Sequence, residues 1–284
     1  MRKLLILGVL LAAPGFGQLP ELSRARELYQ KTGYEEALSL LRTIPAKDAA
    51  VHALAGKCHY MLGEFKKASD SFELAVRLAP DAAEHHLWLG RAYGRRAETS
   101  SFVTAPGLAS KARQSFEKAV ELNPRATEAV ADLFEYYLEA PGFLGGGMEK
   151  ARALAEKTKN LNLAEYHYRL ALIAGKKKEF GVAEEHLRRA VDLAPRQVGR
   201  ILDLAAFLAK QGQYQQSDAA FNRAEQVAPD SPRVLFERAK AYIRAKRNLA
   251  AARELLVRYL NSPLSPDDPP RSQAEQLLKQ VQSG

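Results

Sequence analysis

The chain has 284 residues, of which 46% are hydrophobic and 26% are charged. This composition excludes collagen-like and wholly disordered chains and is sufficient for a buried core. The formal net charge is +9, and the single cysteine, Cys58, excludes an internal disulfide, so that stability must come from packing. We expect Cys58 to be a small core residue.

Residues 1–17 have the features of an export signal. Arg2 and Lys3 precede an apolar run at residues 4–13, and Gly15 and Gly17 precede a cleavage point near Gln18. The run is too short to span a bilayer, which takes about 20 residues. We therefore expect an exported protein, periplasmic or secreted, with no transmembrane segment in the mature chain. An uncleaved N-terminal anchor is the alternative.

Three later segments repeat one pattern. They are "HALAGKCHYMLGEFKKASDSFELAVRLAP" at 52–80, "HYRLALIAGKKKEFGVAEEHLRRAVDLAP" at 167–195 and "ILDLAAFLAKQGQYQQSDAAFNRAEQVAP" at 201–229. Each ends at a proline, with a small residue five positions earlier and an aromatic residue or leucine eight positions earlier. Pro195 and Pro229 are 34 residues apart. A fixed period of this size, with two amphipathic helices in each period, is typical of a solenoid of helical hairpins.

This period resembles that of the tetratricopeptide repeat (TPR) family. Gly-x-aromatic turns at residues 63–65 and 212–214 fit the family, and Leu89, Gly90 and Tyr93 fall on its Leu-Gly-x-x-Tyr pattern, although His86 replaces its usual Trp. The resemblance implies an all-α fold, a right-handed superhelix of about seven hairpins, because a lone hairpin cannot bury its apolar face. The expected units are 18–48, 49–82, 83–126, 127–163, 164–197, 198–231 and 232–265. A capping helix and tail follow at 266–284.

Two consecutive units enlarge the turn between their helices, at loops 97–110 and 141–147. The sequence "APG" occurs in both turns, at 105–107 and 140–142, which predicts that they pack together. Both turns are similar to those of a group of exported bacterial TPR proteins, a resemblance that implies no activity. "PGFLGGG" follows a helix and lacks the Lys-Ser or Lys-Thr of a phosphate loop. We expect Phe143 and Leu144 to pack back onto the neighbouring helices, and an exposed contact for a partner is the alternative.

Residues that could support catalysis or metal binding do not form a recognisable motif. His52, His59 and His86 could approach one another, but no cysteine or carboxylate cluster with zinc spacing accompanies them. No nucleophile, zinc-protease or dinucleotide fingerprint occurs. We therefore expect a non-enzymatic protein–protein interaction scaffold of the bacterial cell envelope, without metal or cofactor. The alternative is a metal-binding or catalytic protein that uses the two inserted loops.

The charge is concentrated in the second half of the chain. Residues 1–149 hold 18 Lys and Arg against 18 Asp and Glu, whereas residues 150–284 hold 24 against 15. The TPR resemblance implies that the first helix of each unit lines a concave groove. The side chains expected there are Lys57, Tyr60, Arg91, Arg95, Tyr168, Lys176, Lys210, Phe236, Lys240 and Arg244. Such a groove would suit a protein or peptide partner of acidic character, and the alternative is a plain solvated face. Export and the scattered charges argue against nucleic acid.

Overall fold

The structure, a computed structural model, describes residues 20–45 and 47–282, so that the expected signal segment 1–17 lies outside the described residues. Helices account for 77% of the described residues, and this part of the chain contains no strand, which confirms the all-α prediction. The helices are α1 (Pro20–Gln30), α2 (Tyr34–Thr43), α3 (Ala49–Met61), α4 (Phe65–Leu78), α5 (Ala83–Thr99), α6 (Ala105–Leu122), α7 (Thr127–Glu139), η1 (Gly142–Leu144), α8 (Met148–Thr158), α9 (Leu163–Lys176), α10 (Phe180–Leu193), α11 (Val198–Lys210), α12 (Tyr214–Val227), α13 (Pro232–Arg244), α14 (Leu249–Leu260) and α15 (Arg271–Gln282).

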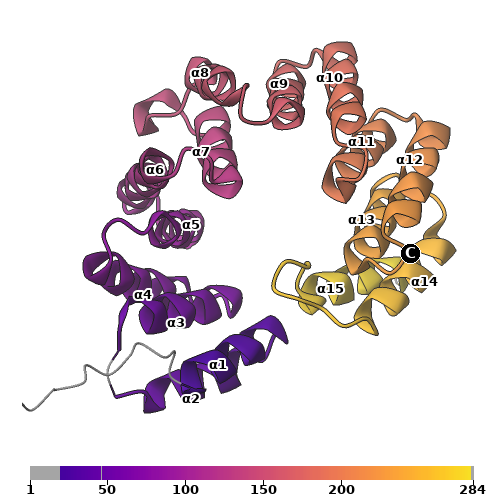
Figure 1. Cartoon of the computed structure of the whole chain (residues 1–284). Helices are drawn as coiled ribbons and strands as arrows, with labels where there is room; N and C mark the ends of the chain where they lie inside the picture. The colour runs from indigo at the N-terminus through magenta and orange to yellow at the C-terminus, as the bar shows by residue number, and fades with distance from the viewer. Residues whose placement is uncertain (1–19, 46, 283–284) are drawn as a thin grey trace, which may run out of the picture.

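The first fourteen α-helices pair into hairpins, each packed on the next, to form a solenoid. Figure 1 shows that the solenoid curves into a broad arc, with α3, α7, α11 and α13 on its inner side. Their partners α4, α8 and α12 lie on the outer side. The inner helices are the first helices of their hairpins, and they line the concave face.

Glycine and proline set the ends of these helices. Gly63 and Gly212 hold left-handed backbone conformations, with φ of 75° and 76°, in the turns that follow α3 and α11. A residue without a Cβ adopts this conformation without strain. Pro80 and Pro229 follow the ends of α4 and α12, where a residue that lacks an N–H stops the helix.

The two helices of a hairpin approach closely where a glycine of one packs against a phenylalanine ring of the other. A Cβ added at Gly90 of α5 would lie 2.6 Å from the Phe116 ring of α6, and one added at Gly56 of α3 would lie 2.8 Å from the Phe72 ring of α4. Phe72 is fully buried. Buried residues from α3 to α9 form one hydrophobic cluster that passes from hairpin to hairpin, as nearest-neighbour packing requires.

The first inserted segment differs from the expected loop. Most of residues 97–110 are helical, because α5 continues to Thr99 and α6 begins at Ala105. Only a five-residue turn, 100–104, separates them. The second inserted segment contains the short 3-10 helix η1, which contacts α6 of the preceding hairpin. Ala97 and Ala109 of the first segment line one cavity with Pro141 and Leu144 of the second. Direct packing of the two segments on each other stays a prediction.

The C-terminal segment returns toward the beginning of the solenoid. α15 packs on α14 and α13, with Ala274 fully buried, and caps the stack. The loop before α15 lies across from the first hairpins, since Asp267 shares a cavity with Tyr29 and Lys57. This closeness of the two ends is visible in Figure 1.

Candidate functional site

The concave face of the last two hairpins carries a pocket of about 570 Å³ between α11 and α13. Three of the cations expected in the groove, Lys210, Lys240 and Arg244, line it together with Phe207 and Tyr214. Lys210 and Arg244 are 34 residues apart, so they occupy the same position in successive repeats. Both stand in the last turn of their helices, where the helix dipole favours positive charge.

The cations of this pocket differ in their partners. Lys240 donates to Glu237 Oε2 at 2.8 Å, within one turn of α13. Lys210 and Arg244 make no ion pair with any residue that the structure describes. The pocket therefore keeps two uncompensated positive charges beside two aromatic rings.

The cations of the earlier hairpins are neutralised within the chain. Most of them pair with a carboxylate on a neighbouring hairpin, at N–O distances between 2.5 and 2.9 Å, and one pairs within its own helix. The inter-hairpin pairs are Lys57 with Glu84, Arg91 with Glu128 and Asp132, and Lys176 with Glu139. The pair within a helix is Arg95 with Glu98. Carboxylates of adjacent hairpins therefore face these cations, and two of them, Glu128 and Glu139, belong to the fourth unit.

Trp88 is a functional candidate that the sequence did not single out. Lys57 Nζ and Arg91 Cζ lie 5.1 and 4.8 Å from its ring centroid, and the Tyr60 ring meets it edge-on at 5.4 Å. These four side chains and Arg95 line one cavity of about 1210 Å³, which the C-terminal loop closes on the other side. Trp88 is the only tryptophan of the chain, and this could have marked it as a candidate from the sequence alone.

Comparison with known proteins agrees with this architecture. Tetratricopeptide repeat models match residues 164–197 and 202–269. The chain is a tetratricopeptide repeat protein. No curated protein matches it.

Solved structures with the same fold include two TPR proteins. One, a thermophilic TPR protein from Thermus thermophilus, is 20% identical, with a TM-score of 0.53 over 66% of this chain and 97% of the other. The second, from Parabacteroides merdae, is 15% identical, with a TM-score of 0.57 over 92% of this chain and 97% of the other. At these identities the likeness establishes the fold alone. TPR folds serve as protein–protein interaction scaffolds.

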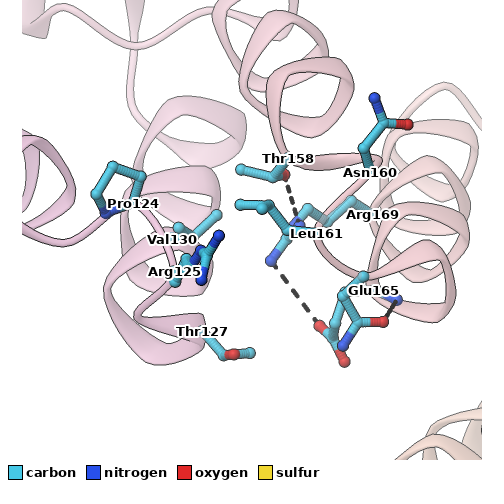
Figure 2. A pocket seen from close by; sticks show the side chains of 10 residues that line it. Pro124, Arg125, Thr127, Val130, Thr158, Asn160, Leu161, Glu165 and Arg169 are labelled. Atoms are coloured by element: carbon cyan, nitrogen blue, oxygen red, sulfur yellow. Dashed lines mark hydrogen bonds and ion pairs between the residues drawn. The ribbon is translucent and has the colours of Figure 1, made fainter.

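A buried polar seam crosses the middle of this TPR solenoid. Glu165 and Arg169 of α9 are only 2% and 4% exposed. Arg169 donates to Thr158 Oγ1 at 2.9 Å, as Figure 2 shows, and Arg200 of α11 donates to Glu165 Oε1 at 2.9 Å. Burial lowers the pKa of Arg169 and raises that of Asp203, which lies beside Arg200. Buried charges are tolerated when each has a partner, so the role of the seam is structural.

Tyr168, expected in the groove, lies beside this seam. The Arg200 guanidinium carbon is 3.5 Å from the Tyr168 ring centroid and covers the ring. Burial raises the pKa of Tyr168 to about 12, so its hydroxyl stays protonated at neutral pH. The Tyr168 ring is therefore covered by a side chain of the protein itself.

Phe236, also expected in the groove, is a core residue. It is 2% exposed, and its ring packs on Tyr259 of α14 at 5.2 Å. Phe236, Ala239 and Tyr242 recur at intervals of three residues, which places them on the face of α13 that meets α14. The assignment of Phe236 to the partner-binding groove is therefore wrong.

The loop residues Phe143 and Leu144 separate to opposite sides of their turn. Leu144 is half-buried and lies near Tyr136 and Phe116 in a pocket. Phe143 is 83% exposed, so the expectation that it packs back onto the helices is wrong. The Tyr136 hydroxyl donates to the Leu144 carbonyl at 2.9 Å and fixes this orientation.

The histidines have separate contacts. His59 lies 2.6 Å from Glu64, His86 lies 2.7 Å from the Pro80 carbonyl, and His167 and His186 face each other with their Nδ1 atoms 3.1 Å apart. Within residues 20–45 and 47–282, no group of three or more His, Cys, Asp or Glu side chains could hold a metal ion. None of the helices described combines the length and hydrophobicity that crossing a bilayer requires. Cys58 is buried, and burial raises the pKa of its thiol to about 12.

Proposed function

We propose that this TPR chain is a non-enzymatic scaffold of the bacterial cell envelope that binds an acidic segment of a partner protein in the pocket between α11 and α13. One observation carries the proposal. Lys210 and Arg244 have no carboxylate partner among the described residues, whereas the groove cations of the earlier hairpins all have one. A carboxylate that enters this pocket therefore displaces no internal carboxylate from Lys210 or Arg244.

The pocket offers two kinds of interaction to such a segment. Lys210 and Arg244 can donate charge-assisted hydrogen bonds, which are about twice as strong as neutral ones. Phe207 and Tyr214 provide apolar surface beside these cations. Without residues 1–17, which hold Arg2 and Lys3 and no acidic residue, the chain keeps a formal net charge of +7. This charge attracts an acidic segment over a longer distance and increases the rate of association. The proposed ligand is therefore an extended stretch with several carboxylates and at least one aromatic residue.

The envelope location rests on the pattern at residues 1–17. The export machinery recognises a positively charged N-terminus, an apolar run and small residues before the cleavage site. Expression with a C-terminal tag, followed by fractionation of cytoplasm and envelope, tests this part. Export should remove the leader and place the tag outside the cytoplasm, and retention of an uncut protein in the cytoplasm would refute it.

The pocket is tested with a defined probe. A fluorescein-labelled peptide of about twelve residues, built from Glu, Asp and Phe, is compared by fluorescence anisotropy with a copy in which Gln and Asn replace the acids. The acidic peptide should bind at least tenfold more tightly, about 1.4 kcal/mol. Lys210→Glu combined with Arg244→Glu should remove this preference. The preference should also weaken between about 50 and 300 mM salt.

A matched control separates the pocket from the general charge of the molecule. Arg223 and Arg253 are exposed on α12 and α14 and make no ion pair within the described part of the chain. Arg223→Glu combined with Arg253→Glu changes the net charge by the same amount as the pocket variant. An equal loss of binding in both double variants would show that long-range charge, and no particular pocket, holds the peptide.

A further inference from the structure

The loops that join the two helices of each hairpin lie along one edge of the solenoid, which we call the turn edge. Each loop with its flanking helical turns spans residues 28–37, 59–68, 95–111, 137–151, 174–183, 208–217 or 242–252. These segments contain 14 Lys and Arg against 7 Glu and no Asp. The opposite edge, at 42–51, 77–86, 121–130, 157–166, 192–201 and 225–234, contains 9 of each sign. The turn edge is therefore more positive than the opposite edge. Its segments in hairpins α5/α6 to α9/α10 contribute 7 Lys and Arg against 4 Glu.

The same edge carries the most exposed apolar side chains of the described structure. Phe102 and Val103 are 89% and 71% exposed in the turn between α5 and α6, and Phe143 is 83% exposed in the next hairpin. The second turn lies against α6 of the hairpin that carries the first, since a Cβ added at Gly145 would lie 2.7 Å from Arg113 Nε. None of these three side chains lines a pocket described above. They project from the edge as separate tips.

These tips are held by ordered backbone. In the first turn, the amides of Thr104 and Ala105 both donate to the Ser101 carbonyl, at 3.1 and 2.9 Å. In the second, the Gly145 amide donates to the Gly142 carbonyl at 2.9 Å, and Lys150 Nζ donates to the Gly145 carbonyl at 2.9 Å. Hydrogen-bonded turns that hold large apolar groups in water are costly, because the ordering gains no burial in the isolated chain.

Four lysines of the turn edge in hairpins α5/α6 to α9/α10 are available to an external anion. Lys111, Lys150, Lys177 and Lys178 make no ion pair with any residue between 20 and 282 that the structure describes. Lys178 also has a left-handed backbone, with φ of 63°, at the turn position that Gly63 and Gly212 occupy in their hairpins. Glycine is the favoured residue in that conformation. A lysine there keeps a positive charge on the edge at the expense of backbone strain.

We infer that the turn edge of hairpins α5/α6 to α9/α10 docks on an anionic lipid surface. Phenylalanine tips enter the boundary between headgroups and acyl chains, and the surrounding lysines meet the lipid phosphates, the combination that holds peripheral proteins at membranes. The exposed lysines are complementary in charge to anionic lipid headgroups. A folded protein partner is less suitable, because isolated apolar side chains without a groove offer it little complementary shape. Docking in this way leaves the concave pocket between α11 and α13 open.

The test uses the chain from Gln18, the expected mature start, which retains every described helix, so that the apolar run at 4–13 cannot contribute. Its helical circular dichroism is first compared with that of the full chain. Co-sedimentation then uses vesicles of phosphatidylcholine alone or with about 30% phosphatidylglycerol. The protein should sediment only with the anionic vesicles. Phe102→Ser combined with Phe143→Ser should weaken this binding about tenfold without changing the melting temperature. Lys178→Gly should weaken binding and raise the melting temperature.

A control on the opposite edge uses Leu78 and Leu161, which are 56% and 49% exposed. Leu78→Ser combined with Leu161→Ser should leave vesicle binding unchanged. Absence of binding, equal binding to neutral vesicles, or an equal loss in this control would overturn the inference. A loss that depends on the lysines alone, with the phenylalanine variant binding normally, would also overturn it, because the edge would then bind polyanions in general.

Discussion

Gly90 is the residue at which the packing of one hairpin is most sensitive to an added atom. A Cβ there would lie 2.6 Å from two carbons of the Phe116 ring, and Phe116 is buried and cannot move into solvent. Gly90→Ala should therefore lower the free energy of unfolding by about 1–3 kcal/mol, the usual cost of overpacking. Urea unfolding followed by circular dichroism measures the change.

Gly94, one turn further along α5, is the matched control. A Cβ there would meet nothing within 4 Å. Because alanine is the better helix former, Gly94→Ala should raise the free energy of unfolding by about 0.5–1 kcal/mol. Gly90→Ala and Gly94→Ala, both on α5, should thus change the free energy of unfolding in opposite directions. The same sign for both would refute the account of the contact between α5 and α6.

The His167–His186 contact makes stability depend on pH. Burial lowers the pKa of His167 below its ordinary value of 6.5, with His186, Arg189 and Lys159 acting in the same direction and Glu185 opposing them. Below about pH 6.5 the unfolded chain binds a proton that the folded chain excludes, so the contribution of His167 is complete above that pH and is lost as the pH falls. His52 and His85 have lowered pKa values too and add to the loss.

The free energy of unfolding should therefore fall between about pH 7.5 and pH 5.5. His167→Asn should make this fall smaller, because asparagine does not titrate. The comparison is of urea unfolding curves for both proteins at the two pH values. An identical fall in the variant would show that His167 does not contribute.

At the scale of single elements, the second inserted loop is held by hydrogen bonds and scarcely by apolar burial. The Tyr136 hydroxyl donates to the Leu144 carbonyl, and the Gly147 amide donates to the Tyr137 carbonyl at 2.7 Å. Tyr136→Phe should lower the free energy of unfolding by about 1 kcal/mol, as for one lost hydrogen bond. Phe143→Ser should change it little, because the ring is exposed. Thermal unfolding of the two variants compares the two losses of stability. A larger loss for Phe143→Ser than for Tyr136→Phe would contradict this account of the loop.

The elements themselves were largely predictable from the sequence. The prolines and the 34-residue spacing mark the ends of helices, because proline and the Gly-x-aromatic turn act locally. The insertion at 97–110 was misjudged for an equally local reason. Ala97, Glu98 and Thr99 extend α5, and Pro106 is tolerated in the first turn of α6, so most of the added residues lengthen helices.

At the scale of the whole molecule, Glu165 connects two hairpins through the buried polar seam. It lies 2.9 Å from Arg200 and 3.9 Å from Arg169. Glu165→Ala would leave the buried Arg169 without its carboxylate and should cost about 3–5 kcal/mol. The exposed Glu254 has no ion pair among the described residues, so Glu254→Ala should cost less than about 0.5 kcal/mol. Similar losses would show that the seam does not stabilise the solenoid.

The sites were less predictable than the fold, because their charges depend on contacts between hairpins. The sequence pattern predicts that Arg91 is a groove cation. In the structure, Arg91 pairs with Glu128 and Asp132, which lie 37 and 41 positions later in the chain. The acidic positions of the fourth unit were visible in the sequence, but their distances from the cations of the third unit were not. The sequence placed Lys210 and Arg244 in the groove, but the absence of an ion pair for them among the described residues is known only from the structure.

The most direct test of the proposed scaffold is an unbiased selection of peptides from a displayed random library on the immobilised chain. The native protein should enrich peptides that combine Asp or Glu with an aromatic residue. The Lys210→Glu, Arg244→Glu variant should lose this enrichment, and the Arg223→Glu, Arg253→Glu control should keep it. Enrichment of peptides without acidic residues, or the same acidic peptides on the native protein and the pocket variant, would contradict binding in the pocket between α11 and α13.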